Sequence, residues 1–141
     1  MKPILICCWG GEDLFESDED EGMTLTARAC YRAACEAVSL LRIGIKNTSI
    51  SEPTQEDGWA YFNLPINVAC TVVWLLVDEK EHFAFQFRPQ RTGCLGVFFR
   101  RAGIKEHLFE KALKDIQAAV SSGKLLQNQK WISAEEFDEI Y

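Results

Sequence analysis

Cysteine and histidine are the side chains in this sequence that could act as a nucleophile, a base or a metal ligand. The cysteines are Cys7, Cys8, Cys30, Cys35, Cys70 and Cys94, and the histidines are His82 and His107. Structural zinc sites use pairs such as Cys-x-x-Cys, because a short loop lets two thiolates share one ion. No pair here has that spacing, and neither histidine lies in a local motif with a thiol or hydroxyl. We therefore expect no metal, no cofactor and no catalytic set, which argues against an enzyme.

The acidic residues are concentrated in one segment, and this is the strongest functional signal in the chain. Residues 1–66 hold 5 basic and 11 acidic residues, whereas residues 67–141 hold 10 of each, so the first part carries the whole net charge of −6. The acids of the segment are Glu12, Asp13, Glu16, Asp18, Glu19, Asp20 and Glu21, and they surround Leu14 and Phe15. Charges direct association, and a buried aromatic side chain can anchor an interface. We predict that residues 10–23 form an acidic loop that binds a basic protein partner; the alternative is a solvated loop whose Phe15 packs into the core.

Nucleic acid is disfavoured as a partner, because an acidic chain repels phosphates at long range. A local basic group lies around the last two predicted strands, 83–88 and 94–100, and comprises Arg88, Arg91, Arg100, Arg101 and Lys105. Aromatic residues beside arginines on a sheet can stack with bases. However, Phe83, Phe85 and Phe87 alternate with other residues, as is typical of a strand face covered by helices. We therefore expect a phenylalanine core and an exposed arginine rim.

A second set of residues could line a pocket for a small molecule. Trp59 and Tyr61 fall in a weakly alternating segment over 59–64, and Trp74 falls in the next predicted strand, 68–77. Aromatic side chains with a few polar groups are common in ligand pockets. The alternative to the interaction module is therefore a small-molecule-binding or enzymatic domain with an aromatic pocket lined by Trp59, Tyr61 and Trp74.

Hydrophobic periodicity predicts the elements that would position these side chains. Continuous or alternating apolar residues predict strands over 3–9, 59–64, 68–77, 83–88 and 94–100. The charged residues between 68–77 and 83–88 predict that these two strands form a hairpin. Apolar residues at helical spacing predict a helix that ends at Gly44 and a second over 104–122. Residues 46–58 are interpreted as a polar connection whose turn residues are Pro53, Asp57 and Gly58. A short last helix begins at Ser133, where Ser133 and Glu136 fit a capping box and Ile132 and Phe137 a hydrophobic staple.

The order of these elements predicts an α+β fold. Consecutive strands without intervening helices favour a mainly antiparallel sheet of about five strands, with helices packed on one face and the first strand central. The chain of 141 residues has the size of one domain, and we see no linker, so residues 1–141 are expected to form a single compact domain.

The surroundings of the cysteines indicate the compartment. Cys7, Cys8 and Cys70 lie in apolar runs, where reduced cysteine behaves as a small buried residue. Free core thiols are typical of a reducing cytoplasm. The apolar stretch 3–9 is too short for a secretory signal, and no run approaches the ~20 residues that cross a bilayer. We therefore expect a cytoplasmic protein without a membrane partner.

Two functional classes remain. We favour a small acidic interaction module, whose size, acidity and lack of a catalytic motif match the profile of an immunity protein or an inhibitor of a nuclease-like toxin. The second class is the pocket domain described above. The exposed faces of the helix at 26–42 and of the last helix would equally allow a homodimer.

Overall fold

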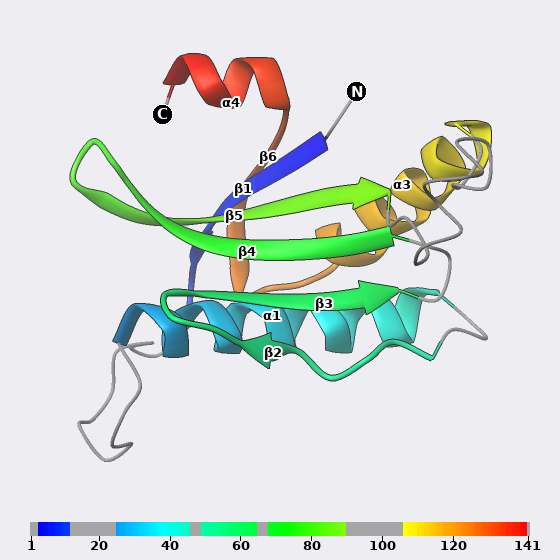
Figure 1. The fold of residues 1–141 in the computed structure, drawn as a ribbon, viewed down its shortest axis with the longest axis horizontal. Coiled ribbons are helices and arrows are strands. Elements are labelled where there is room, and N and C mark those ends of the chain that lie inside the picture. The colour runs from blue at the N-terminus through cyan, green and yellow to red at the C-terminus, as the bar shows by residue number, and fades with distance from the viewer. Residues whose placement is uncertain (1–2, 12–24, 46–48, 65–67, 90–105, 141) are drawn as a thin grey trace, which may run out of the picture.

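The computed structural model describes residues 3–11, 25–45, 49–64, 68–89 and 106–140, which form an antiparallel sheet with helices on both faces (Figure 1). The strands are β1 (Pro3–Trp9), β2 (Thr54–Gln55), β3 (Trp59–Leu64), β4 (Val68–Val77), β5 (Lys80–Pro89) and β6 (Leu126–Ser133). The helices are α1 (Leu25–Gly44), α3 (Glu106–Ser121) and α4 (Ala134–Ile140). Within these ranges the sheet is six-stranded, in the order β2-β3-β4-β5-β1-β6.

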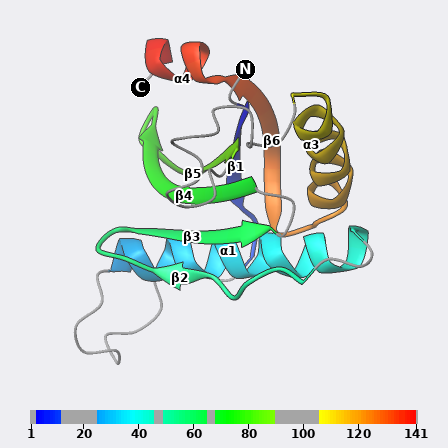
Figure 2. The same ribbon diagram turned by 45° about the vertical axis from the view of Figure 1, so that its right-hand side comes forward.

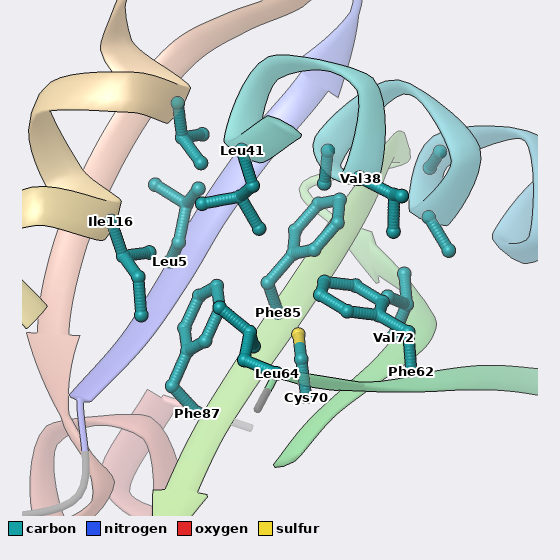
Figure 3. Close-up of a cluster of buried hydrophobic side chains, with 14 of the residues drawn as sticks. Leu5, Val38, Leu41, Phe62, Leu64, Cys70, Val72, Phe85, Phe87 and Ile116 are labelled. Atoms are coloured by element: carbon teal, nitrogen blue, oxygen red, sulfur yellow. The ribbon is translucent and has the colours of Figure 1, made fainter. Parts of the chain in front are cut away.

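One face of the sheet carries the main core. In β3, β4 and β5 every second side chain points toward this face, and the large ones are phenylalanines and valines. Figure 3 shows Phe62, Phe85 and Phe87 packed together with Cys70 and Val72 beneath the long helices. Fully burying side chains of this size contributes about 1.5–3 kcal/mol each. This packing determines which side chains must remain on the other face.

Helix α1 lies close to the covered face because its buried side is made of small residues. Ala29, Ala33 and Ala37 are fully buried, and α1 contacts β3 and β4. Gly44 ends the helix against α3, where an added Cβ would lie 2.5 Å from the Cβ of Ala119. A glycine is therefore required at this close approach of two helices. Figure 2 shows α1 beneath β3, and α3 beside β6.

Helix α4 lies on the opposite face, as both views show (Figures 1 and 2). The Ser133 hydroxyl accepts a hydrogen bond of 3.1 Å from the backbone N–H of Glu136, which is the predicted cap. Phe137 packs beside Ile132 in a second, smaller cluster with Ile4 and Ile6. The helix therefore covers the outer face over β1 and β6.

The predicted fold class is confirmed, with three differences in detail. As expected, the first strand, β1, is internal and lies between β5 and β6. Strand β6 was missed, because it lies at the sheet edge and only its Leu126 and Ile132 are buried, which weakens the apolar pattern. The short β2 lies within the segment interpreted as a polar connection. The helix α4 packs on the face opposite to α1 and α3, whereas one covered face was expected. The strand predicted over 94–100 lies outside the described residues.

The hairpin of β4 and β5 is also confirmed. Val77 pairs with Lys80, so Asp78 and Glu79 form a two-residue turn. Both have positive φ, 50° and 64°, as the type I′ turn of a tight hairpin requires. The two strands pair along their whole length, from Val68 with Pro89 to Val77 with Lys80. Each side chain of β4 is therefore placed against a known neighbour in β5.

Replacing Phe85 by alanine is expected to lower the free energy of unfolding by about 3–5 kcal/mol, because it leaves a cavity in the main core. Leu76→Ala is the control, since Leu76 is 58% exposed, and its effect should stay within about 0.5 kcal/mol. Urea unfolding followed by circular dichroism measures both. Equal effects of the two substitutions would contradict this assignment of the core.

Candidate functional site

The outer face of β3, β4 and β5 carries the side chains that alternate with the core residues. The register aligns them in rows across the three strands. One row is Asn63, Ala69 and Arg88; the next is Tyr61, Thr71 and Gln86; the third is Trp59, Val73 and Ala84. Because side chains point to alternate faces along each strand, all of these share one face.

A hollow lies over β4 on this face. Its floor includes Ala69 and Thr71, which are small, whereas the flanking strands contribute aromatic side chains on one side and Arg88 and Pro89 on the other. The hollow measures about 460 Å³ and is lined by Glu56, Trp59, Tyr61, Asn63, Ala69, Thr71, Arg88 and Pro89. Small side chains between larger ones on neighbouring strands leave a trough along the central strand. The hollow is therefore a direct product of the residue types in β4.

The aromatic wall consists of Trp59 and Tyr61, whose ring centroids lie 5.3 Å apart with an interplanar angle of 34°. A tight turn places this wall: the backbone N–H of Glu56 donates to the carbonyl of Trp59 at 2.8 Å. Gly58 within the turn has φ +107°, a conformation that favours glycine. The predicted turn at residues 57–58 thus sets where β3 and its aromatic side chains begin.

Contacts from α1 and from the segment before β2 hold this part of the sheet in place. The Cys30 thiol of α1 donates to the carbonyl of Gly58 at 3.8 Å. Arg42 donates to the carbonyl of Ile50 at 2.9 Å and pairs with Glu52 at 2.8 Å. Single surface ion pairs contribute little to the free energy of unfolding. The role of these contacts is therefore to hold the segment before β2 in position.

Polar groups are distributed unevenly around the hollow. Glu56 lies at the turn beside Trp59, whereas Arg88 lies in the row of Ala69, toward the other end of β3. The Thr71 Oγ1 is shielded from solvent and has no hydrogen-bond partner among the described residues. A buried hydroxyl without a partner costs about 1–3 kcal/mol. Among the described residues, the Thr71 hydroxyl beneath the hollow therefore has hydrogen-bonding capacity that is not used.

The structure brings together two of the three predicted pocket residues. Trp59 and Tyr61 form the wall of the hollow, whereas Trp74 pairs with Phe83 and packs against the main core on the opposite face. All eight predicted partner-binding residues, Glu12, Asp13, Phe15, Glu16, Asp18, Glu19, Asp20 and Glu21, lie outside the described residues. Sequence reasoning missed Glu56, Asn63, Ala69 and Thr71. The available signal was the pair of small residues at alternate positions of a strand that is otherwise rich in valine.

The described cysteines form no disulfide with one another, and the buried ones are poorly suited to nucleophilic chemistry. Cys7, Cys30 and Cys70 are buried, and Cys8 and Cys35 are half-buried. Burial raises the pKa of the Cys7 and Cys30 thiols from 9.0 to about 12 and also raises the pKa of Cys70. Thiolate is the reactive form, so these three thiols stay protonated and act as core side chains. Within the described ranges no three His, Cys, Asp or Glu side chains lie close enough to hold a metal ion.

Comparisons with protein-family models, with curated proteins and with solved structures found no match to this chain. Among the described helices, none combines the length and the apolar character needed to cross a membrane.

The raised pKa values predict that alkaline pH destabilises the protein. The unfolded thiols release protons above pH 9, whereas the folded Cys7 and Cys30 hold theirs until about pH 12. The contribution of these thiols to the free energy of unfolding is therefore fully present below pH 9 and is lost as the pH rises from 9 to 12. Each such thiol adds up to about 1.4 kcal/mol per pH unit to the slope. In urea unfolding at pH 8–11, the free energy of unfolding should decline less steeply with pH for Cys7→Ala than for the parent. Identical slopes would refute the raised pKa of Cys7.

Proposed function

We propose that this chain is a binding protein and that its ligand site is the hollow over β4. The observation that carries the proposal is the arrangement of small floor residues between an aromatic wall and an arginine. Pockets for small molecules commonly measure about 300–1,000 Å³ and combine apolar walls with a few polar groups. The hollow, at about 460 Å³, has this size and composition.

The placement of the hollow supports this proposal over a purely structural role. Aromatic side chains on a sheet are commonly buried by a covering helix. Here α1 and α3 pack on the opposite face, and α4 contacts β1 and β6. Trp59 and Tyr61 are only half-buried. Their apolar surface is therefore available to a ligand.

A blocking substitution tests the proposal. A panel of aromatic small molecules is screened by thermal unfolding, because a ligand that binds only the folded state raises the melting temperature. Ala69→Phe places a ring in the floor of the hollow and is expected to remove the rise produced by each hit. Leu76→Phe adds the same ring on an exposed side chain elsewhere and should leave the rise unchanged.

Two results would overturn this proposal. One is the absence of any compound that raises the melting temperature of the parent protein. The other is a hit that stabilises Ala69→Phe as much as it stabilises the parent. The melting temperature of each variant without ligand shows whether the variant is folded.

A second candidate function is an acidic interaction module, favoured by the seven acids within residues 12–21. These charges flank Leu14 and Phe15, so the segment has both the charge and the apolar anchor for a basic protein partner. An immunity protein or inhibitor would use such a segment. This candidate is independent of the hollow, and the two functions could coexist in one chain.

Affinity purification of the tagged chain from its native host, at low and at moderate salt, tests this second candidate. We expect a stoichiometric basic protein that is retained at low salt and weakened at moderate salt. Neutralising the four acids at 18–21 to Asn and Gln should reduce its recovery. Neutralising the four acids of α4, within 135–139, removes the same charge elsewhere and should not. Recovery of the chain alone, or equal loss in both variants, would contradict this function.

A further inference from the structure

We propose that the ligand of the hollow is a flat aromatic molecule with one anionic group, the ring lying beside Tyr61 and the anion on Arg88. This inference rests on the proposed function, because it assigns a ligand class to the same site. Three features of the described residues support it: the aromatic wall, the position of Arg88, and the negative charge of Glu56 at the other end of the hollow.

The wall and floor favour a flat ring. Trp59 and Tyr61 present two adjacent aromatic side chains on β3, and aromatic rings prefer offset-stacked or edge-to-face partners. Thr71, directly opposite Tyr61 in the register, is small enough to leave room beside the ring. A flat ligand in the trough would therefore contact an aromatic side chain along one edge and the floor of β4 beneath.

Arg88 favours an anion at one end of that ring. It is exposed, it lines the hollow, and it makes no ion pair with any residue that the structure describes. Its guanidinium presents several donors in a planar fork that matches carboxylate and phosphate oxygens. A ligand anion would thus meet a cation that no described residue engages in an ion pair.

The spacing across the sheet sets the size of the ligand. Tyr61 on β3 and Arg88 on β5 are two strands apart across the sheet and one row apart along it, so the usual strand separation and rise put their backbones about 12 Å apart. Both side chains line the hollow and take up part of that distance, so two fused rings with a carboxylate are long enough to fill the remainder. Glu56 lines the hollow beside Trp59, so a second anion at that end would be repelled. The site therefore suits a single anionic group in one orientation.

Three naphthalene compounds of different charge test the inference by isothermal titration calorimetry. They are 2-naphthoate, 2-naphthalenemethanol and 2-naphthylmethylamine, which carry an anion, no charge and a cation on the same ring. We expect 2-naphthoate to bind at least about tenfold more tightly than the alcohol, because hydrogen bonds to charged groups are the stronger ones. The amine should bind most weakly.

Variants assign this preference to Arg88. Arg88→Gln should remove the advantage of 2-naphthoate over the alcohol and leave the affinity for the alcohol within about twofold. Lys130→Gln removes a positive charge from an exposed side chain of β6 that does not line the hollow. It should change neither the advantage of 2-naphthoate nor the affinity for the alcohol. If adenosine monophosphate competes with 2-naphthoate, the anion is assigned to a nucleotide phosphate. If it does not compete, the anion is assigned to an aromatic carboxylate.

The outcomes separate this inference from the proposed function. Equal binding of the acid and the alcohol, with both lost in Ala69→Phe, would overturn the anionic class and keep the hollow as a site. An unchanged preference in Arg88→Gln would overturn the role of Arg88. If none of the three compounds binds, the inference is wrong, and the thermal screen of the wider panel decides the proposed function on its own.

Discussion

Burial of alternate side chains of β3, β4 and β5 beneath α1 is the interaction on which the rest of the structure depends. Phe62, Cys70 and Phe87 occupy one row of the register, and Val72 pairs with Phe85 in the next. Because side chains alternate with a period of two, a slip of one residue would turn the whole apolar set to the other face. The cost of exposing it fixes the register. The composition of the outer face follows from this, since every residue there is the neighbour of a core residue.

The close approach of α1 connects this core to the candidate site. An alanine-rich side lets the helix backbone lie near the sheet, and at that distance the Cys30 thiol reaches the carbonyl of Gly58. Burial keeps this thiol protonated, with a pKa raised to about 12, so that it can act as a donor. Gly58 in turn precedes Trp59, the first residue of the aromatic wall. The helix on one face thus helps to position the aromatic side chains on the other.

The sequence predicted the α+β class, the strands 59–64 and 68–77, the hairpin and both long helices, because each has a strong apolar period or a clear end signal. It did not reveal β6, where Leu126 and Ile132 are the buried positions of an edge strand. It also assigned Trp74 to the same pocket as Trp59 and Tyr61. Trp74 follows Val73, the partner of Trp59. Because adjacent residues of a strand point to opposite faces, Trp74 faces the core. Such cross-strand pairing depends on register, which a single strand pattern does not contain.

The hollow itself could not be predicted for the same reason. Ala69 and Thr71 are unremarkable within a valine-rich strand, and they form a floor only because larger side chains flank them from β3 and β5. The acidic segment is the reverse case: its charge is plain in the sequence and its residues lie outside the described ranges.

The most direct test of the central claim is a two-dimensional NMR titration of the ¹⁵N-labelled protein with 2-naphthoate. If the hollow over β4 is the ligand site, the shifts are saturable and largest at the backbone amides of Tyr61, Thr71 and Arg88, and the residues of α3 are unaffected. Largest shifts on α1, α3 or α4, or no saturable shift at any residue, would contradict it.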